Sequence, residues 1–71
     1  MILNSNAHNG IGILFYNQRK LKEAEECYRK AIEHDLKNSN AHNNLGILLK
    51  NQGKLKEAED CYRKAKELKL K

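Results

Sequence analysis

The side chains best suited to metal binding or nucleophilic catalysis are two cysteines and three histidines, and four of these five residues form equivalent pairs. Cys27 and Cys61 lie 34 residues apart, as do His8 and His42. Zinc sites place ligands at short spacings such as C-x2-C or H-x3-H, which do not occur here. Two cysteines are also too few for a disulfide framework. We therefore expect no metal and no intrachain disulfide, and we interpret the histidines as helix-packing residues and the cysteines as part of a partly exposed helix face.

The acidic residues also lack a catalytic arrangement. Glu25, Glu26 and Glu33 lie three or four residues from Arg29 or Lys30, which is typical of ion pairs along a solvated helix face. No Ser-His-Asp or Cys-His arrangement, phosphate-binding loop or isolated carboxylate pair stands apart from this pattern. We expect a protein that is not an enzyme and that binds no cofactor.

The net charge is +5, and it is concentrated in the second half of the chain. Residues 4–37 carry six basic and five acidic side chains, whereas residues 38–71 carry eight and four. A basic surface can attract nucleic acid, but we interpret these lysines as keeping an exposed helix soluble. The sequence contains no apolar run long enough to cross a bilayer. We expect a soluble, cytoplasmic protein with neither nucleic acid nor membrane among its partners.

The elements that position these residues follow from an internal repeat. The stretch NAHNGIGILF at residues 6–15 returns as NAHNNLGILL at residues 40–49, and 25 of the 34 pairs between residues 4–37 and 38–71 are identical. A fixed period of this kind sets the architecture. We divide the chain into an N-terminal remnant (1–3) and two units (4–37 and 38–71).

Each unit contains two amphipathic helix patterns, in which apolar residues recur every three or four positions. In the second unit these residues are Ala41, Leu45, Leu48 and Leu49, followed by Leu55, Ala58, Tyr62, Ala65 and Leu68. The chain contains no proline, and no strand pattern competes. The predicted helices cover residues 5–18, 21–35, 39–52 and 55–69.

Glycine and asparagine mark the predicted helix ends. Gly53 suits the left-handed residue that ends a helix, and Asn38 suits an N-cap. Arg19 replaces this glycine in the first unit, so a non-glycine residue must take the left-handed conformation at a cost of about 1 kcal/mol. Gly10 and Gly12 each weaken the first helix by up to about 1 kcal/mol relative to alanine. We expect this helix to be the least stable.

Seven positions in each unit match a known repeat signature. They are His8, Ile11, Gly12, Phe15, Ala24, Tyr28 and Ala31 in the first unit, and His42, Leu45, Gly46, Leu49, Ala58, Tyr62 and Ala65 in the second. This pattern resembles the tetratricopeptide repeat, W-x2-L-G-x2-Y…A-x3-F…P. The resemblance covers residues 4–71 and implies an all-α, right-handed superhelical stack of two helix-turn-helix units with four antiparallel helices. It also implies that these residues pack the repeats, with the glycines facing Ala24 and Ala58 and the tyrosines between helix pairs.

The resemblance further implies that the first helix of each unit lines a concave face, where family members commonly hold peptides. The non-packing residues on these two helices are Asn6, Asn9, Ile13, Tyr16 and Asn17, and Asn40, Asn43, Asn44, Ile47, Lys50 and Asn51. An asparagine amide both donates and accepts hydrogen bonds, which suits a peptide backbone. We expect a non-catalytic protein–protein interaction scaffold that presents this Asn-rich face to a peptide or to another copy of itself.

The signature proline between units is Leu36 here, with Ile2 and Leu70 at the equivalent positions. Without proline, residues Asp35 to Ser39 are free to become helical and to fuse two helices. This predicts a domain-swapped dimer or another homo-oligomer. Phe15 and Tyr16 place aromatic side chains on the outermost helix, which is the first place to seek a partner or a second copy.

Two alternatives stay open. The first alternative to the interaction scaffold is an engineered or excised repeat with a structural or self-assembly role and no natural ligand, and the second is a basic helical repeat that binds RNA. The RNA alternative depends on charge alone, and salt-dependent RNA binding would support it.

Overall fold

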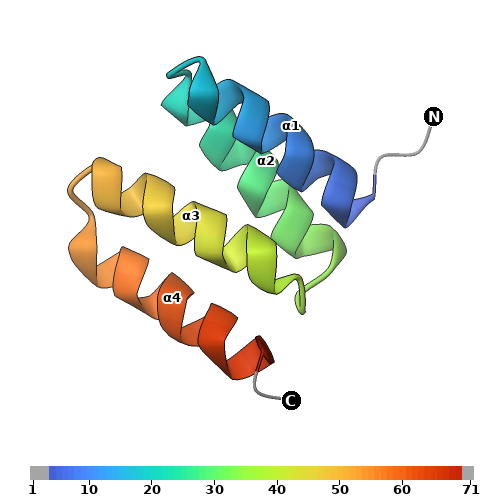
Figure 1. The fold of residues 1–71 in the computed structure, drawn as a ribbon, viewed down its shortest axis with the longest axis vertical. Helices are drawn as coiled ribbons and strands as arrows, with labels where there is room; N and C mark the ends of the chain where they lie inside the picture. Colours follow the sequence, from blue (N-terminus) through green and yellow to red (C-terminus); the bar gives the residue numbers. More distant parts are fainter. Residues whose placement is uncertain (1–3, 70–71) are drawn as a thin grey trace.

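The computed structural model describes residues 4–69, which form four α-helices and no strand (Figure 1). The helices are α1 (Ser5–Asn17), α2 (Leu21–His34), α3 (Ser39–Asn51) and α4 (Leu55–Lys69). Each helix boundary lies within one residue of its predicted position, so the predicted all-α fold class is confirmed. The N-terminal remnant (1–3), Leu70 and Lys71 lie outside the described residues.

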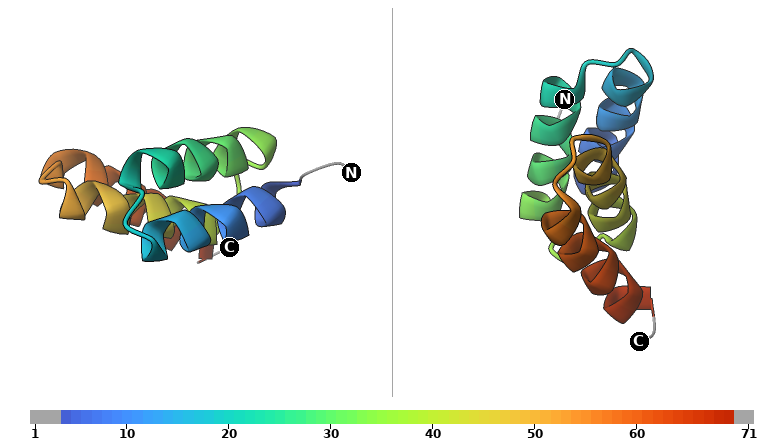
Figure 2. Two further views of the ribbon diagram at one scale, coloured as in Figure 1. Left: turned by 90° about the horizontal axis from the view of Figure 1, so that it is seen from above. Right: turned by 90° about the vertical axis from the view of Figure 1, so that its left-hand side faces the viewer.

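The helices form two hairpins that stack side by side. Helix α1 packs against α2, and α3 packs against α4. The hairpins are joined mainly by α2 against α3, and α1 also reaches α3 (Figures 1 and 2). Among the described elements, the backbone of α4 closely approaches that of α3 alone. The Cα atoms extend over 31 × 28 × 15 Å, so the stack is a slab about half as thick as it is wide.

The two hairpin turns have the same geometry although their central residues differ. Arg19 has φ 63° and Gly53 has φ 80°, so both adopt the left-handed conformation. The following residues close the turns in the same way: the amide of Lys20 donates to the carbonyl of Phe15, and that of Lys54 donates to the carbonyl of Leu49, each at 2.9 Å. The prediction that Arg19 takes the left-handed conformation is confirmed.

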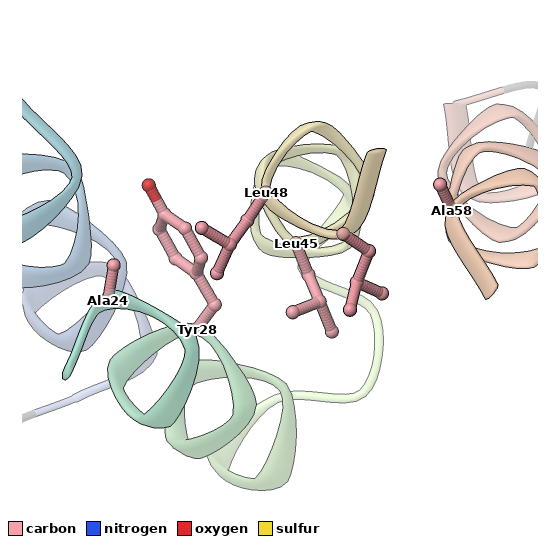
Figure 3. Packing of buried hydrophobic residues seen from close by; sticks show 6 residues of the cluster. Ala24, Tyr28, Leu45, Leu48 and Ala58 are labelled. Carbon is pink, nitrogen blue, oxygen red and sulfur yellow. The ribbon is translucent and has the colours of Figure 1, made fainter. Parts of the chain in front are cut away.

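The core lies between the hairpins and extends into the second one, because Ala58 of α4 belongs to the same buried cluster as Tyr28 of α2. Leu45, Leu48 and Leu49 of α3 are 3%, 0% and 1% exposed. The ring of Tyr28 rises from α2 toward Leu48 and is 2% exposed (Figure 3). A tyrosine therefore fills the space between one helix pair and the next.

Gly12 and Gly46 permit a close approach of the two helices in each hairpin. A Cβ atom at Gly12 would lie 2.6 Å from Cε1 of Tyr28 and 3.2 Å from Cβ of Cys27. The side chains nearest to this position are those of Tyr28 and Cys27, and the expected approach to Ala24 stays a prediction. At Gly46 the corresponding neighbours are the tyrosine and cysteine of α4. The cysteines thus lie partly buried in the helix contact.

The segment from Asp35 to Ser39 does not fuse α2 and α3 into one continuous helix. This corrects the expectation that the segment becomes helical without proline. Helix α2 ends at His34, and the carboxylate of Asp35 accepts a hydrogen bond from the Lys37 amide at 3.0 Å. The side-chain oxygen of Asn38 then accepts from the Ala41 amide at 3.2 Å and begins α3. An aspartate turn and an asparagine cap therefore separate the helices where the signature has proline.

Candidate functional site

A small pocket opens between α1 and α3. Its walls are Ile13 and Tyr16 from α1, Tyr28 from α2, and Asn44 and Ile47 from α3, and its volume is about 180 Å³. Ile13 is 39% exposed and Ile47 is 37% exposed. Two branched aliphatic side chains therefore face solvent around a pocket that is large enough for one apolar side chain of a ligand.

Helical periodicity explains why these residues share one face. Asn6, Asn9, Ile13, Tyr16 and Asn17 follow one another at intervals of three or four residues along α1, apart from the adjacent last pair. Such residues lie on one side of a helix. The equivalent positions of α3 form a second stripe, and the stacking of the hairpins brings part of each stripe together.

Asparagine side chains join the two stripes. The side-chain amide of Asn44 donates to the side-chain oxygen of Asn9 at 2.9 Å. The amide of Asn51 donates to the hydroxyl of Tyr16. Since an asparagine side chain carries two N–H donors and a carbonyl acceptor, each of these contacts leaves Asn44 and Asn51 further hydrogen-bonding capacity. The amides are therefore held in place and still suited to bind a ligand.

A second, wider pocket adjoins the first at the hairpin turn. It is lined by Tyr16, Asn17, Arg19, Leu21 and Asn51 and has a volume of about 570 Å³. Tyr16 lines both pockets. Arg19 of the left-handed turn also lines this pocket, so a basic residue beside the apolar pocket favours an anionic group there.

Not every residue expected on the concave face lines these pockets. Asn6 is exposed and accepts a hydrogen bond from the side-chain amide of Asn38 at 3.2 Å. Asn40 and Lys50 are exposed and Asn43 is half-buried, and none of these three lines either pocket. The pockets therefore draw on a subset of the two stripes.

The residues expected to pack the repeats divide into two groups. Nine are buried and the other five are half-buried: the buried ones are Gly12, Ala24, Tyr28, Ala31, Leu45, Gly46, Leu49, Ala58 and Ala65, and the half-buried ones are His8, Ile11, Phe15, His42 and Tyr62. The ring of His8 stacks on that of His34 with centroids 4.9 Å apart, and Nε2 of His42 forms a hydrogen bond with the Leu36 carbonyl at 3.0 Å. His8 therefore makes a packing contact and His42 a polar contact, each near the N-terminal end of the first helix of its unit.

Sequence reasoning missed a buried polar link between the repeats. The hydroxyl of Ser5 donates to the Ala31 carbonyl at 2.6 Å and accepts from the side-chain amide of Asn38 at 2.7 Å. This link connects the start of α1, the end of α2 and the start of α3. The recurrence of Asn4-Ser5 as Asn38-Ser39 is a signal that could have revealed it.

Partial burial of Cys27 and Cys61 argues against nucleophilic chemistry by their thiol groups. Burial raises the pKa of the Cys27 and Cys61 thiols and that of the Tyr28 hydroxyl. A raised thiol pKa lowers the fraction of reactive thiolate at neutral pH. Within residues 4–69, no group of three side chains is arranged to hold a metal ion, and none of the described helices is long and apolar enough to cross a membrane.

The family model of the tetratricopeptide repeat matches residues 5–38 and again residues 39–69. These two adjacent matches follow the two hairpins of the fold. No curated protein matches the chain.

Proposed function

Because the chain belongs to the tetratricopeptide repeat family, whose helical repeats generally act as non-catalytic protein-interaction modules, we propose that it binds an extended peptide. The peptide lies on the surface around the pocket between α1 and α3, which we call the α1–α3 face. The observation that carries this proposal is the apolar pocket between α1 and α3, with the exposed side chains of Ile13 and Ile47 on opposite walls. Ligand sites commonly combine apolar walls with a few well-placed polar groups.

The pocket supports a peptide with one aliphatic or aromatic anchor residue. A volume of about 180 Å³ corresponds to roughly six water molecules at liquid density. Burial of a Leu-sized side chain contributes about 1.5–3 kcal/mol. Tyr28 forms part of the lining and is itself held by the core, so this part of the pocket is preformed.

The amides beside the pocket support contact with the peptide backbone. Asn9 and Asn44 are half-buried and bonded to each other, so little side-chain entropy is lost when a ligand adds a hydrogen bond. An extended backbone offers both N–H and C=O groups. The neighbouring pocket, with Arg19 at its edge, favours an acidic residue or a carboxylate close to the anchor.

Peptide selection followed by a matched pair of variants tests this proposal. A library of random peptides is selected against the whole chain, and the affinity of a selected peptide is measured by fluorescence anisotropy. Ile47→Lys places a charge on the pocket wall, whereas Leu36→Lys makes the same chemical change at a leucine that is 68% exposed and lines neither pocket.

We expect selected peptides to share an apolar residue, and we expect Ile47→Lys to weaken binding by about tenfold or more. Leu36→Lys should bind like the parent chain. Circular dichroism of both variants controls for loss of helix. Equal affinity of the two variants, or a selection that yields no binding peptide, would contradict the proposal.

A further inference from the structure

Helix α1 exposes an apolar face that repeats the buried face of α3. The buried residues Leu45, Leu48 and Leu49 of α3 correspond to Ile11, Leu14 and Phe15 of α1 through the 34-residue repeat. Leu48 is 0% exposed because α2 covers it, whereas the equivalent Leu14 is 61% exposed. We call Ile11, Leu14 and Phe15 the α1 face.

Helix α4 presents the other half of the same contact. Leu21, Tyr28 and Ile32 of α2 pack against the core that includes α3. Their equivalents on α4 are Leu55, Tyr62 and Lys66, which we call the α4 face. Leu55 is 59% exposed, while Leu21 is only partly exposed. The α4 face is open because, among the described helices, the backbone of α4 closely approaches that of α3 alone.

The internal interface therefore shows what fits these two faces, and we propose that the chain stacks head to tail on a second copy of itself. Helix α4 of one copy packs on α1 of the next, as α2 packs on α3 within one copy. Five of the six side chains on the two faces are apolar or aromatic. Such a heterologous contact uses different surfaces on the two partners and extends to longer arrays when the rotation does not close a ring.

A polar link can form across the same contact. Inside the chain, Asn38 donates to Ser5, which donates to the carbonyl of Ala31. Asn4 of a second copy corresponds to Asn38, and Ser39 and Ala65 correspond to the other two residues. The side chain of Asn4 already accepts from the Ala7 amide at 2.9 Å, as that of Asn38 accepts from the amide of Ala41. Asn4 is thus held at the start of α1 by the same cap contact that holds Asn38 at the start of α3.

Two differences between the repeats make the contact between copies weaker than the internal interface. Lys66 stands at the position of the partly buried Ile32, so its ammonium group must reach water along its aliphatic stem. Gly10 stands at the position of Asn44, so the amide contact with Asn9 has no counterpart between copies. Association is therefore weaker than the contact between repeats and depends on protein concentration.

The test uses variants in which one of the two faces is blocked. Analytical ultracentrifugation of the whole chain, up to millimolar concentration, measures their association. Lys66→Ile restores the repeat residue and should strengthen association about tenfold or more. Leu14→Glu blocks the α1 face and Leu55→Glu blocks the α4 face; both residues are exposed, so the fold should tolerate the change. Leu36→Glu is the control, because the internal interface leaves Leu36 68% exposed.

In the Lys66→Ile background, we expect Leu14→Glu and Leu55→Glu each to be monomeric, and their equimolar mixture to form a dimer and nothing larger. This result requires that the open α4 face of one variant meets the open α1 face of the other. A Lys66→Ile chain that stays monomeric would overturn the proposal, as would a mixture that stays monomeric. Association that survives either blocking change would also overturn it, because it would show a symmetric contact or a different surface. None of the residues of the α1 face or the α4 face lines the apolar pocket, so this test is independent of the test of peptide binding.

Discussion

Two glycines in the same helix should respond in opposite directions to the same substitution. A Cβ atom at Gly10 would have no neighbour within 4 Å, whereas one at Gly12 would lie 2.6 Å from Cε1 and 2.7 Å from Cδ1 of Tyr28. Tyr28 is 2% exposed and packs against both α1 and α3, so its ring cannot easily move away. The Gly10→Ala and Gly12→Ala pair therefore separates helix propensity from packing.

The magnitudes follow from these surroundings. Alanine is favoured over glycine in a helix interior by about 0.8–1.0 kcal/mol, and Gly10→Ala should stabilise the chain by that amount. Gly12→Ala gains the same propensity but adds overpacking, which costs about 1–3 kcal/mol. The free energies of unfolding of the two variants should therefore differ by about 1–3 kcal/mol, with Gly10→Ala the more stable.

Thermal and urea unfolding followed by circular dichroism measure this difference. For a domain of this size, 1 kcal/mol changes the melting temperature by about 4–8 °C, so the gap is readily resolved. Gly46→Ala is a graded comparison, because its nearest contact is 2.9 Å and the facing Tyr62 is only half-buried; its cost should be smaller than that of Gly12→Ala. A Gly12→Ala variant at least as stable as Gly10→Ala would refute the packing argument.

Three further predictions concern the polar link, the turn and alkaline pH. Asn38→Ala should cost about 2 kcal/mol or more, since it removes a cap and a buried contact to Ser5, whereas Asn4→Ala should cost about 1 kcal/mol for its exposed cap; equal losses in urea unfolding would contradict this. Arg19→Gly should raise the free energy of unfolding by about 1 kcal/mol because φ is 63° there, and a destabilised variant would argue against that reasoning. Burial raises the pKa of Tyr28, so the folded chain holds the hydroxyl proton more tightly than the unfolded chain, and stability should fall as pH rises above about 10. Tyr28→Phe should lose less stability than the parent chain between about pH 8 and about pH 10.5, and an equal loss would exclude Tyr28 as a source.

Much of the fold was predictable because the repeat tests each pattern twice. The apolar spacing in one unit recurs in the other, and Asn38 and Gly53 mark helix ends through local chemistry. The break between α2 and α3 was predicted less well, because the absence of proline removes one stop signal without showing that the Asp35 carboxylate supplies another. Local hydrogen bonds of this kind depend on backbone geometry as well as residue type.

The candidate site was only partly predictable. Periodicity places Ile13 and Ile47 on the same side of their helices, but it does not tell where a second helix approaches. The pairing of Asn44 with Asn9, and the contribution of Tyr28 to the pocket, follow from the angle and offset of the stacked hairpins. Arg19 also enters the site from a turn, outside either helical stripe.

Mapping of amide chemical shifts shows residue by residue whether the α1–α3 face holds a peptide. A library-selected peptide is titrated into the isotopically labelled chain. We expect the largest shifts at the backbone amides of Ile13, Asn44 and Ile47 and at the side-chain amides of Asn9 and Asn44. Shifts confined to the outer sides of α2 and α4, or to the α1 face and the α4 face, would contradict this expectation.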